Sequence, residues 1–121
     1  MITGLAGITL WTDDLEGMFR FYHQTLGLPV HAEHADFVAF QVGELRFNIG
    51  RHEQIHGPAG DPYRMMPHLA VKDIHKEHQR LLALGVEFIR PPELEHWGGW
   101  VATFKDPDGN ILQFLQFPEL G

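Results

Sequence analysis

The sequence predicts an α+β fold of two tandem βαβββ modules that form curved, incompletely closed mixed sheets with helices on the outer face. Two observations support this prediction: an internal repeat, and the alternation of strand and helix signals within each half. Each half reads as a strand, an amphipathic helix that ends at a glycine, and three further strands. Thr25–Leu28 in the first half (Thr-Leu-Gly-Leu) corresponds to Ala83–Val86 in the second (Ala-Leu-Gly-Val).

The chain of 121 residues has the length of one domain. We expect a single domain over residues 1–121, with module one at about 1–51, a linker at about 52–65 and module two at about 66–121. The linker shows no hydrophobic periodicity and carries several glycines and prolines together with His52 and His56, which is typical of a connecting loop.

The first module opens with a strand over Leu5–Thr12. Alternation places Ile8 and Leu10 on the face that the helix covers, and leaves Gly7, Thr9 and Trp11 on the opposite, concave face. Asp13-Asp14 supplies the helix cap, and Gly27 ends the helix. The remaining elements of this module are expected at Leu15–Leu26 (helix), Leu28–His31, Asp36–Val42 and Glu44–Ile49 (strands).

The second module repeats this order. A strand around His68 leads to the capping residue Asp73, and Gly85 ends the helix that follows. We expect Pro91-Pro92 to end the next strand, and the turn Asp106–Asn110 to join the last two. These elements are expected at Ile74–Leu84 (helix), Val86–Ile89, Trp100–Phe104 and Ile111–Gln116 (strands).

The composition indicates a soluble globular protein, with 44% hydrophobic and 21% charged residues. The absence of cysteine excludes disulfides and thiolate chemistry, and a net charge of −7 disfavours nucleic acid as a partner. No apolar run reaches the ~18–20 residues that span a membrane, and no basic leader precedes one, so we expect a cytoplasmic protein without a membrane partner.

The repeat, the pair Phe21-Tyr22 before Leu26-Gly27-Leu28, and the Asp-Pro-Asp-Gly-Asn turn before the last strand together resemble the vicinal oxygen chelate superfamily. This is the group of glyoxalase I, bleomycin-resistance proteins and ring-cleaving dioxygenases. The resemblance covers nearly the whole chain and implies the fold, whereas one fold of this kind hosts many reactions.

The resemblance also implies four inward positions where the family carries metal ligands. Gly7 corresponds to His68 on the first strands of the two modules, and Asn48 corresponds to Gln113 on their last strands. Only His68 is a strong donor, Asn48 and Gln113 offer neutral amide oxygens, and Gly7 has no side chain. We therefore expect no metal cofactor. A divalent metal held by His68 and Gln113, completed by a loop histidine, is the alternative. The loop run His31, Glu33 and His34 is either a weak metal site or a solvated loop.

Aromatic side chains form the second candidate feature. Trp97 lies in a glycine-rich loop beside His96, and Trp11 and Phe37 are expected to line the same concavity. Trp100 is either a pocket residue or part of the core. Arg46 either binds an anionic group or pairs with Glu44. The candidate ligand-binding residues are Trp11, Arg46, Asn48, His68, His96, Trp97 and Gln113, and the catalytic residues are unknown.

These features favour a small-molecule-binding protein that takes an aromatic or heterocyclic ligand without a metal. The alternatives are a metal-dependent lyase, isomerase or dioxygenase that uses His68 and Gln113, and a subunit or regulatory domain without a small ligand. Members of the superfamily of this size pair their modules between chains, so the resemblance implies a homodimer, side by side or swapped.

Overall fold

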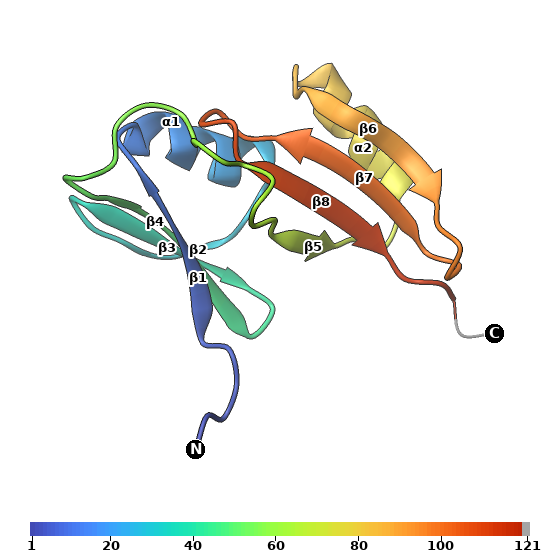
Figure 1. Cartoon of the computed structure of the whole chain (residues 1–121), viewed down its shortest axis with the longest axis horizontal. Coiled ribbons are helices and arrows are strands. Elements are labelled where there is room, and N and C mark those ends of the chain that lie inside the picture. The colour runs from blue at the N-terminus through green and yellow to red at the C-terminus, as the bar shows by residue number, and fades with distance from the viewer. Residues whose placement is uncertain (120–121) are drawn as a thin grey trace. The chain divides into compact units, whose positions relative to one another are not determined.

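The computed structural model describes residues 1–119. The chain divides into two compact units, one comprising Met1–Gly57 and the other beginning at Pro58. Each unit holds a four-stranded mixed sheet and a helical segment, in the predicted order βαβββ (Figure 1). Neither sheet closes into a barrel within the described residues, and the predicted fold class is confirmed.

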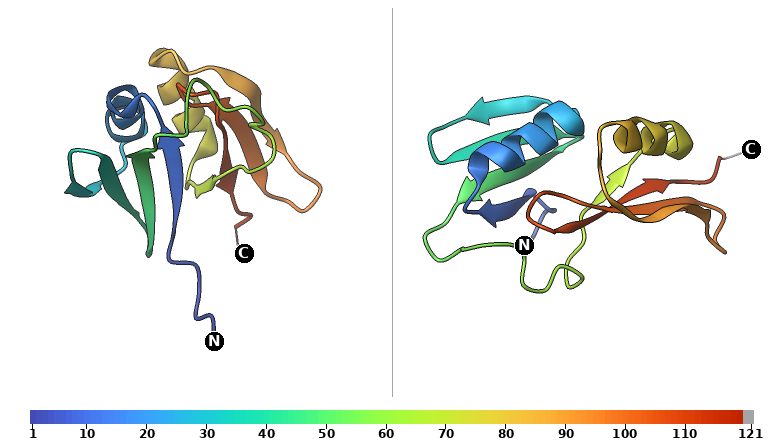
Figure 2. Two further views of the ribbon diagram at one scale, coloured as in Figure 1. Left: turned by 60° about the vertical axis from the view of Figure 1, so that its left-hand side comes forward. Right: turned by 90° about the horizontal axis from the view of Figure 1, so that it is seen from above.

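The sheet of the first unit has the strand order β1-β4-β3-β2, with β1 parallel to β4 and the other neighbours antiparallel. Figure 2 shows the helical segment lying along one face of this sheet. The strands of this unit are β1 (Gly7–Thr12), β2 (Val30–Glu33), β3 (Phe37–Val42) and β4 (Leu45–Arg51).

The first helical segment changes geometry halfway. It begins as α1 (Leu15–Phe19), capped by the Asp14 side chain, whose Oδ1 accepts a hydrogen bond from the Gly17 backbone N–H (3.1 Å). It continues as the π-helix η1 (Arg20–Thr25), so the prediction of one α-helix over Leu15–Leu26 is wrong in its second half. The wider π-turn buries the adjacent Phe21 and Tyr22 together. Gly27 follows with φ 83°, as its predicted role in ending the helix requires.

The second unit repeats the topology with the strand order β5-β8-β7-β6. Its helix α2 (Ile74–Ala83) is capped by Asp73 and contacts β6, β7 and β8. Its strands are β5 (His68–Ala70), β6 (Phe88–Leu94), β7 (Trp100–Lys105) and β8 (Ile111–Gln116).

Strand β6 corrects the prediction that Pro91-Pro92 ends it. The strand runs through both prolines to Leu94. It lies at the edge of the sheet, and its pairing with β7 shifts register between Arg90 and Glu93. Proline lacks an N–H and is tolerated at such edges and bulges, where no ladder hydrogen bond is lost.

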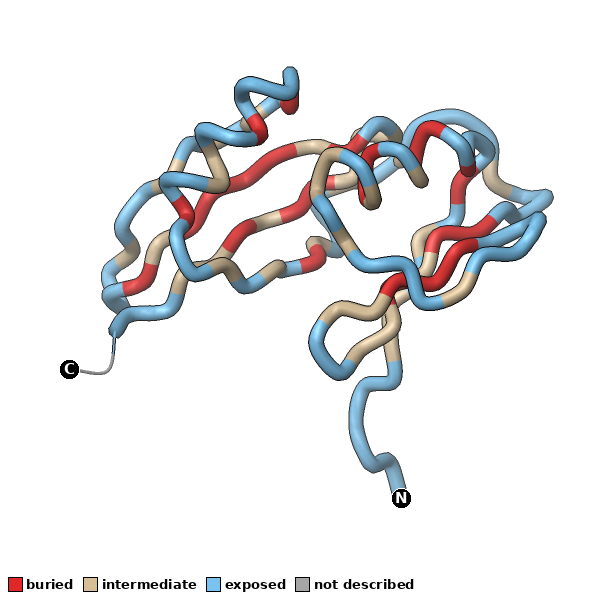
Figure 3. Tube along the Cα trace, turned by 180° about the vertical axis from the view of Figure 1, so that it is seen from behind, coloured by how far each residue is buried: buried red, intermediate tan, exposed pale blue. Residues whose placement is uncertain are grey.

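Each unit has its own core between helix and sheet (Figure 3). Tyr22 and Phe40 are fully buried in the first unit, and Leu81 and Phe104 in the second. On α2, Ile74 and Leu81 are fully buried, whereas Leu82 is 44% exposed. No helix among residues 1–119 is both long and apolar enough to cross a membrane.

Candidate functional site

The open face of each sheet, which we define as the face opposite its helix, carries most of the predicted site residues. In the second unit His68 on β5 lies opposite Gln113 on β8, and Gln113 lies opposite Thr103 on β7. The Gln113 side chain donates from Nε2 to Thr103 Oγ1 (3.1 Å). His68 is exposed, so its imidazole is accessible to a ligand. The structure thus brings two of the predicted residues, His68 and Gln113, side by side.

Arg90 on β6 extends this polar row, because it lies opposite Thr103. Its guanidinium donates to Glu95 and lies 3.1 Å from a carboxylate oxygen of Glu93. The hydrogen bonds that Arg90 donates to Glu95 and Glu93 raise its pKa above the usual value. Arg90 therefore links β6 to the loop that follows it, since Glu93 lies near the end of β6 and Glu95 lies just after it. This pairing was not predicted, because it depends on the register shift in β6.

The equivalent row in the first unit joins Thr9, Asn48 and Ala39. The Asn48 amide donates from Nδ2 to Thr9 Oγ1 (3.3 Å). The counterpart of His68 is therefore Thr9, and the predicted match of Gly7 with His68 is wrong. Gly7 lies two residues earlier, opposite Arg46. Alternation assigns residues to a face, but it does not distinguish positions that are two residues apart.

This donor set does not fit a divalent metal ion. The two rows offer one imidazole, two neutral amides and hydroxyl groups, with both amides engaged by threonines. A divalent cation needs several imidazole or anionic donors to offset its dehydration. Among residues 1–119, no group of three or more His, Asp or Glu side chains is arranged to hold a metal ion. The run His31, Glu33 and His34 therefore forms no such group.

Arg46 lies on the same open face as Asn48, two residues away along β4. Its guanidinium donates to the side-chain oxygen of Gln41, and the Gln41 amide in turn donates to Gly43 O (2.7 Å). Of the two predicted roles, pairing with Glu44 is not what the structure shows. Arg46 is half-buried and oriented by a neutral partner, so its charge remains available for an anionic group.

Trp11 forms the centre of an exposed aromatic cluster in the first unit. It lies opposite Gly50, which lies opposite Phe37. A Cβ added at Gly50 would lie 2.8 Å from the Trp11 ring, so the indole covers the glycine closely. His34 stacks on Phe37 with ring centroids 4.4 Å apart, and His52 meets Trp11 edge to face at 5.3 Å. His34 and His52 were not assigned to this cluster from the sequence, because the pairing of Trp11 with Gly50 depends on the register between β1 and β4.

Trp97 repeats the arrangement in the second unit. Its ring lies over Gly99 so closely that any Cβ there would collide with it, and its centroid lies 6.4 Å from that of Phe117. Trp97 is 43% exposed, and the neighbouring His96 is exposed as well. Trp100 packs edge to face against His75 of α2 (4.6 Å), so of its two predicted roles the structure supports packing.

Comparisons with known proteins agree on one family. The sequence model of the Glyoxalase/Bleomycin resistance protein/Dioxygenase superfamily matches residues 4–114. A bleomycin resistance protein of Klebsiella pneumoniae is 27% identical over 124 residues, which cover 95% of this chain and 94% of that protein.

Solved structures show the same fold. A glyoxalase/bleomycin resistance protein/dioxygenase from Nocardioides superposes with a TM-score of 0.76 at 21% identity, covering 100% of this chain and 87% of the other. A lactoylglutathione lyase from Agrobacterium tumefaciens gives a TM-score of 0.74 at 17% identity, covering 96% of this chain and 95% of the other.

Proposed function

Because the chain belongs to the glyoxalase/bleomycin resistance protein/dioxygenase superfamily, we propose that it is a small-molecule-binding protein that takes an aromatic or heterocyclic ligand on the open faces of its sheets, without a metal. One observation carries the proposal: Trp11 and Trp97 are 48% and 43% exposed, and each ring lies close against a glycine. A tryptophan held in this way presents a rigid apolar surface at little cost in conformational entropy.

The open face of each sheet also carries polar side chains that can form hydrogen bonds, and His96 lies beside Trp97 in the chain. Asn48 and Gln113 each keep an amide oxygen free of the threonine contact described above, and His68 and His96 are exposed. Arg46 adds a positive charge that suits a carboxylate or phosphate. Aromatic surfaces with a few directional polar groups are the usual composition of a small-molecule site.

The relative from Klebsiella pneumoniae makes bleomycin a suitable first probe, together with a panel of planar heteroaromatic compounds. We expect at least one of these probes to change the intrinsic tryptophan fluorescence and to bind in calorimetric titration. Trp97→Ala and Trp11→Ala should each weaken that binding by about 1–3 kcal/mol, the usual loss for a buried aromatic anchor. Tyr63→Ala serves as the matched control, since Tyr63 is an exposed aromatic residue of the connecting segment.

Unchanged affinity in both tryptophan variants, with the fold intact by circular dichroism, would remove these residues from the site. A fluorescence change that persists equally in all variants would show that the probe binds elsewhere.

Elemental analysis of the untagged protein tests the metal-free part of the proposal. We expect less than one equivalent of zinc, nickel, manganese or iron after dialysis, because the open faces lack the required donors. About one equivalent retained through dialysis and lost in His68→Ala would instead favour a metal-dependent lyase, isomerase or dioxygenase.

A further inference from the structure

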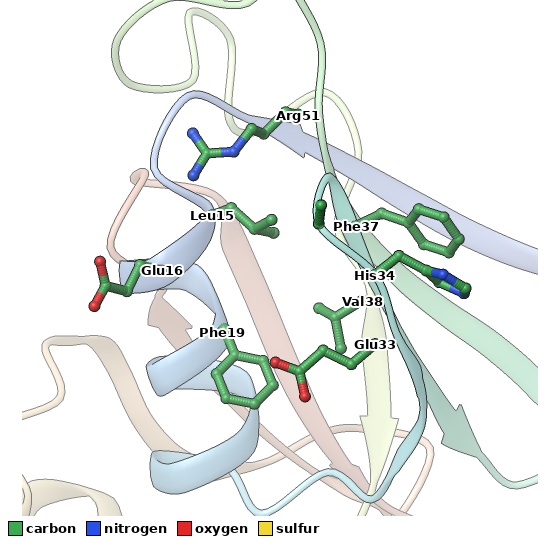
Figure 4. Close-up of a pocket in the computed structure, with 9 residues that line it drawn as sticks. Leu15, Glu16, Phe19, Glu33, His34, Phe37, Val38 and Arg51 are labelled. Atoms are coloured by element: carbon green, nitrogen blue, oxygen red, sulfur yellow. The ribbon is translucent and has the colours of Figure 1, made fainter.

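A pocket of about 200 Å³ lies in the first unit between α1 and the hairpin of β2 and β3 (Figure 4). It opens on the helix side of the sheet, whereas Trp11 lies on the open face. His34 and Phe37 line both features, and Figure 4 shows their rings directed away from the helix that forms the other pocket wall. Its walls are formed by Leu15, Glu16, Phe19, Glu33, Val38 and Arg51, together with the turn at His34–Phe37.

The pocket has an apolar middle and oppositely charged ends. Leu15, Phe19 and Val38 form the middle. Figure 4 shows the Arg51 guanidinium at one end, beyond Leu15, and the Glu33 carboxylate at the other, beside the Phe19 ring. Within residues 1–119 neither charged side chain forms an ion pair or a hydrogen bond. Each charge is therefore available to a ligand.

Glu16 does not alter this polarity. Figure 4 shows its carboxylate directed away from the middle of the pocket. Its Oε1 lies 3.3 Å from Arg20 Nη1, one helical turn later, so its charge is balanced outside the pocket.

The helical wall is held in place by aromatic contacts. The Phe19 ring stacks on Phe40 with centroids 6.2 Å apart, and it lies 5.3 Å from the His23 ring. The π-helix begins at the next residue, Arg20. Departures from α-helical geometry of this kind are frequent beside functional sites, and here the change follows directly after the residue that forms the pocket wall.

From this arrangement we propose that the pocket binds a short zwitterion whose ammonium and carboxylate groups are separated by an apolar chain, such as an ω-amino acid. The carboxylate pairs with Arg51, which can hold both of its oxygens. The ammonium lies between the Glu33 carboxylate and the face of the Phe19 ring, where both attract a cation. A volume near 200 Å³ equals that of about six or seven water molecules, which matches a ligand of this size.

The test uses 6-aminohexanoate, with hexanoate and hexylamine as probes that each carry one of its charges. Titrations followed by two-dimensional NMR should shift the signals of Leu15, Phe19 and Val38, most strongly with the zwitterion. Glu33→Gln and Arg51→Gln should each weaken 6-aminohexanoate binding by about fivefold, the upper range for an exposed ion pair. Glu33→Gln should leave hexanoate binding unchanged, and Arg51→Gln should leave hexylamine binding unchanged.

Two further variants complete the design. Ala35→Trp should abolish binding while keeping both charges, because Ala35 lies at the pocket wall. Glu44→Gln, which removes a charge from the exposed turn between β3 and β4, should bind like the wild type. The proposal is overturned if the three probes bind equally well, if no pocket signal shifts, or if Ala35→Trp leaves binding intact. None of these outcomes bears on the tryptophan site.

Discussion

At the scale of single residues, Gly7 shows how closely β1 and β4, which are neighbours in the first sheet, approach each other. A Cβ added at this position would collide with the backbone carbonyl of Arg46 on β4, which cannot rotate away. We expect Gly7→Ala to destabilise the protein by about 1–3 kcal/mol, as overpacking does in cores. Urea unfolding measures this loss, and Gly60→Ala is the control because nothing lies near its added methyl group. Equal stabilities of the two variants would contradict the close approach.

His78 predicts a dependence of stability on pH. Burial is the main cause that lowers its pKa, and the nearby His75 adds to the effect. Its ring packs edge to face on Phe88, with centroids 4.6 Å apart. A histidine whose pKa is lower in the folded state binds protons first in the unfolded state. Above the unfolded-state pKa of 6.5, the titration of His78 therefore does not change the free energy of unfolding. As the pH falls below 6.5 towards the folded-state pKa, the titration of His78 lowers that free energy.

We expect His78→Gln to lose less stability than the wild type when the pH is lowered from about 7 to about 5, because the variant has no imidazole to protonate there. Chemical unfolding at a series of pH values gives the two curves. His31→Gln, which removes an exposed histidine of β2, should keep the wild-type slope. The explanation fails if the His78→Gln curve is parallel to that of the wild type.

At the scale of elements, local signals placed the helices well. Asp73 caps α2, Asp14 caps α1, and Gly27 and Gly85 follow the two helical segments with positive φ, all as the sequence predicts. These features depend on residues close together in the chain. The π-turn at Arg20 and the passage of β6 through Pro91-Pro92 were missed, because both depend on packing and register between distant segments.

The turn between β7 and β8 depends on one carboxylate. Asp106 is 6% exposed, and its oxygens accept hydrogen bonds from the backbone N–H groups of Asp108 and Asn110 (2.9 and 3.0 Å) and from the Asn110 amide (2.9 Å). We expect Asp106→Ala to cost about 1–3 kcal/mol in thermal or urea unfolding, since it leaves these donors unpaired. Asp36→Ala changes an exposed aspartate before β3 and should cost less than about 0.5 kcal/mol. A similar loss in both variants would show that the hydrogen bonds do not hold the turn.

At the scale of the whole chain, alternation predicted which face of each strand the site residues occupy, and His68 and Gln113 do lie side by side. It did not predict the register between neighbouring strands, so Gly7 was chosen in place of Thr9 as the counterpart of His68. The contact of Trp11 with Gly50 was also missed, because only the folded strands bring these two residues together. The contact of Trp97 with Gly99 joins residues close in the chain, but it depends on the conformation of their loop.

We propose that the protein is a homodimer. Each sheet ends in strands with one unpaired edge, β1 and β2 in the first and β5 and β6 in the second. Leu94, Trp97 and Phe117 add large exposed apolar side chains to the second unit. Unpaired edges and exposed apolar groups favour association, and two-fold dimers are the commonest closed form.

Light scattering coupled to size exclusion should give twice the chain mass of 13.8 kDa at micromolar concentration. Because a stable dimer buries more than about 1,000 Å² of surface, the mass should not fall on tenfold dilution. Raising the salt concentration should leave the mass unchanged if apolar contacts dominate, since salt screens only exposed charges. A mass of one chain across the concentration range would contradict the proposal, and a mass that falls with salt would show that charge pairs hold the two chains together.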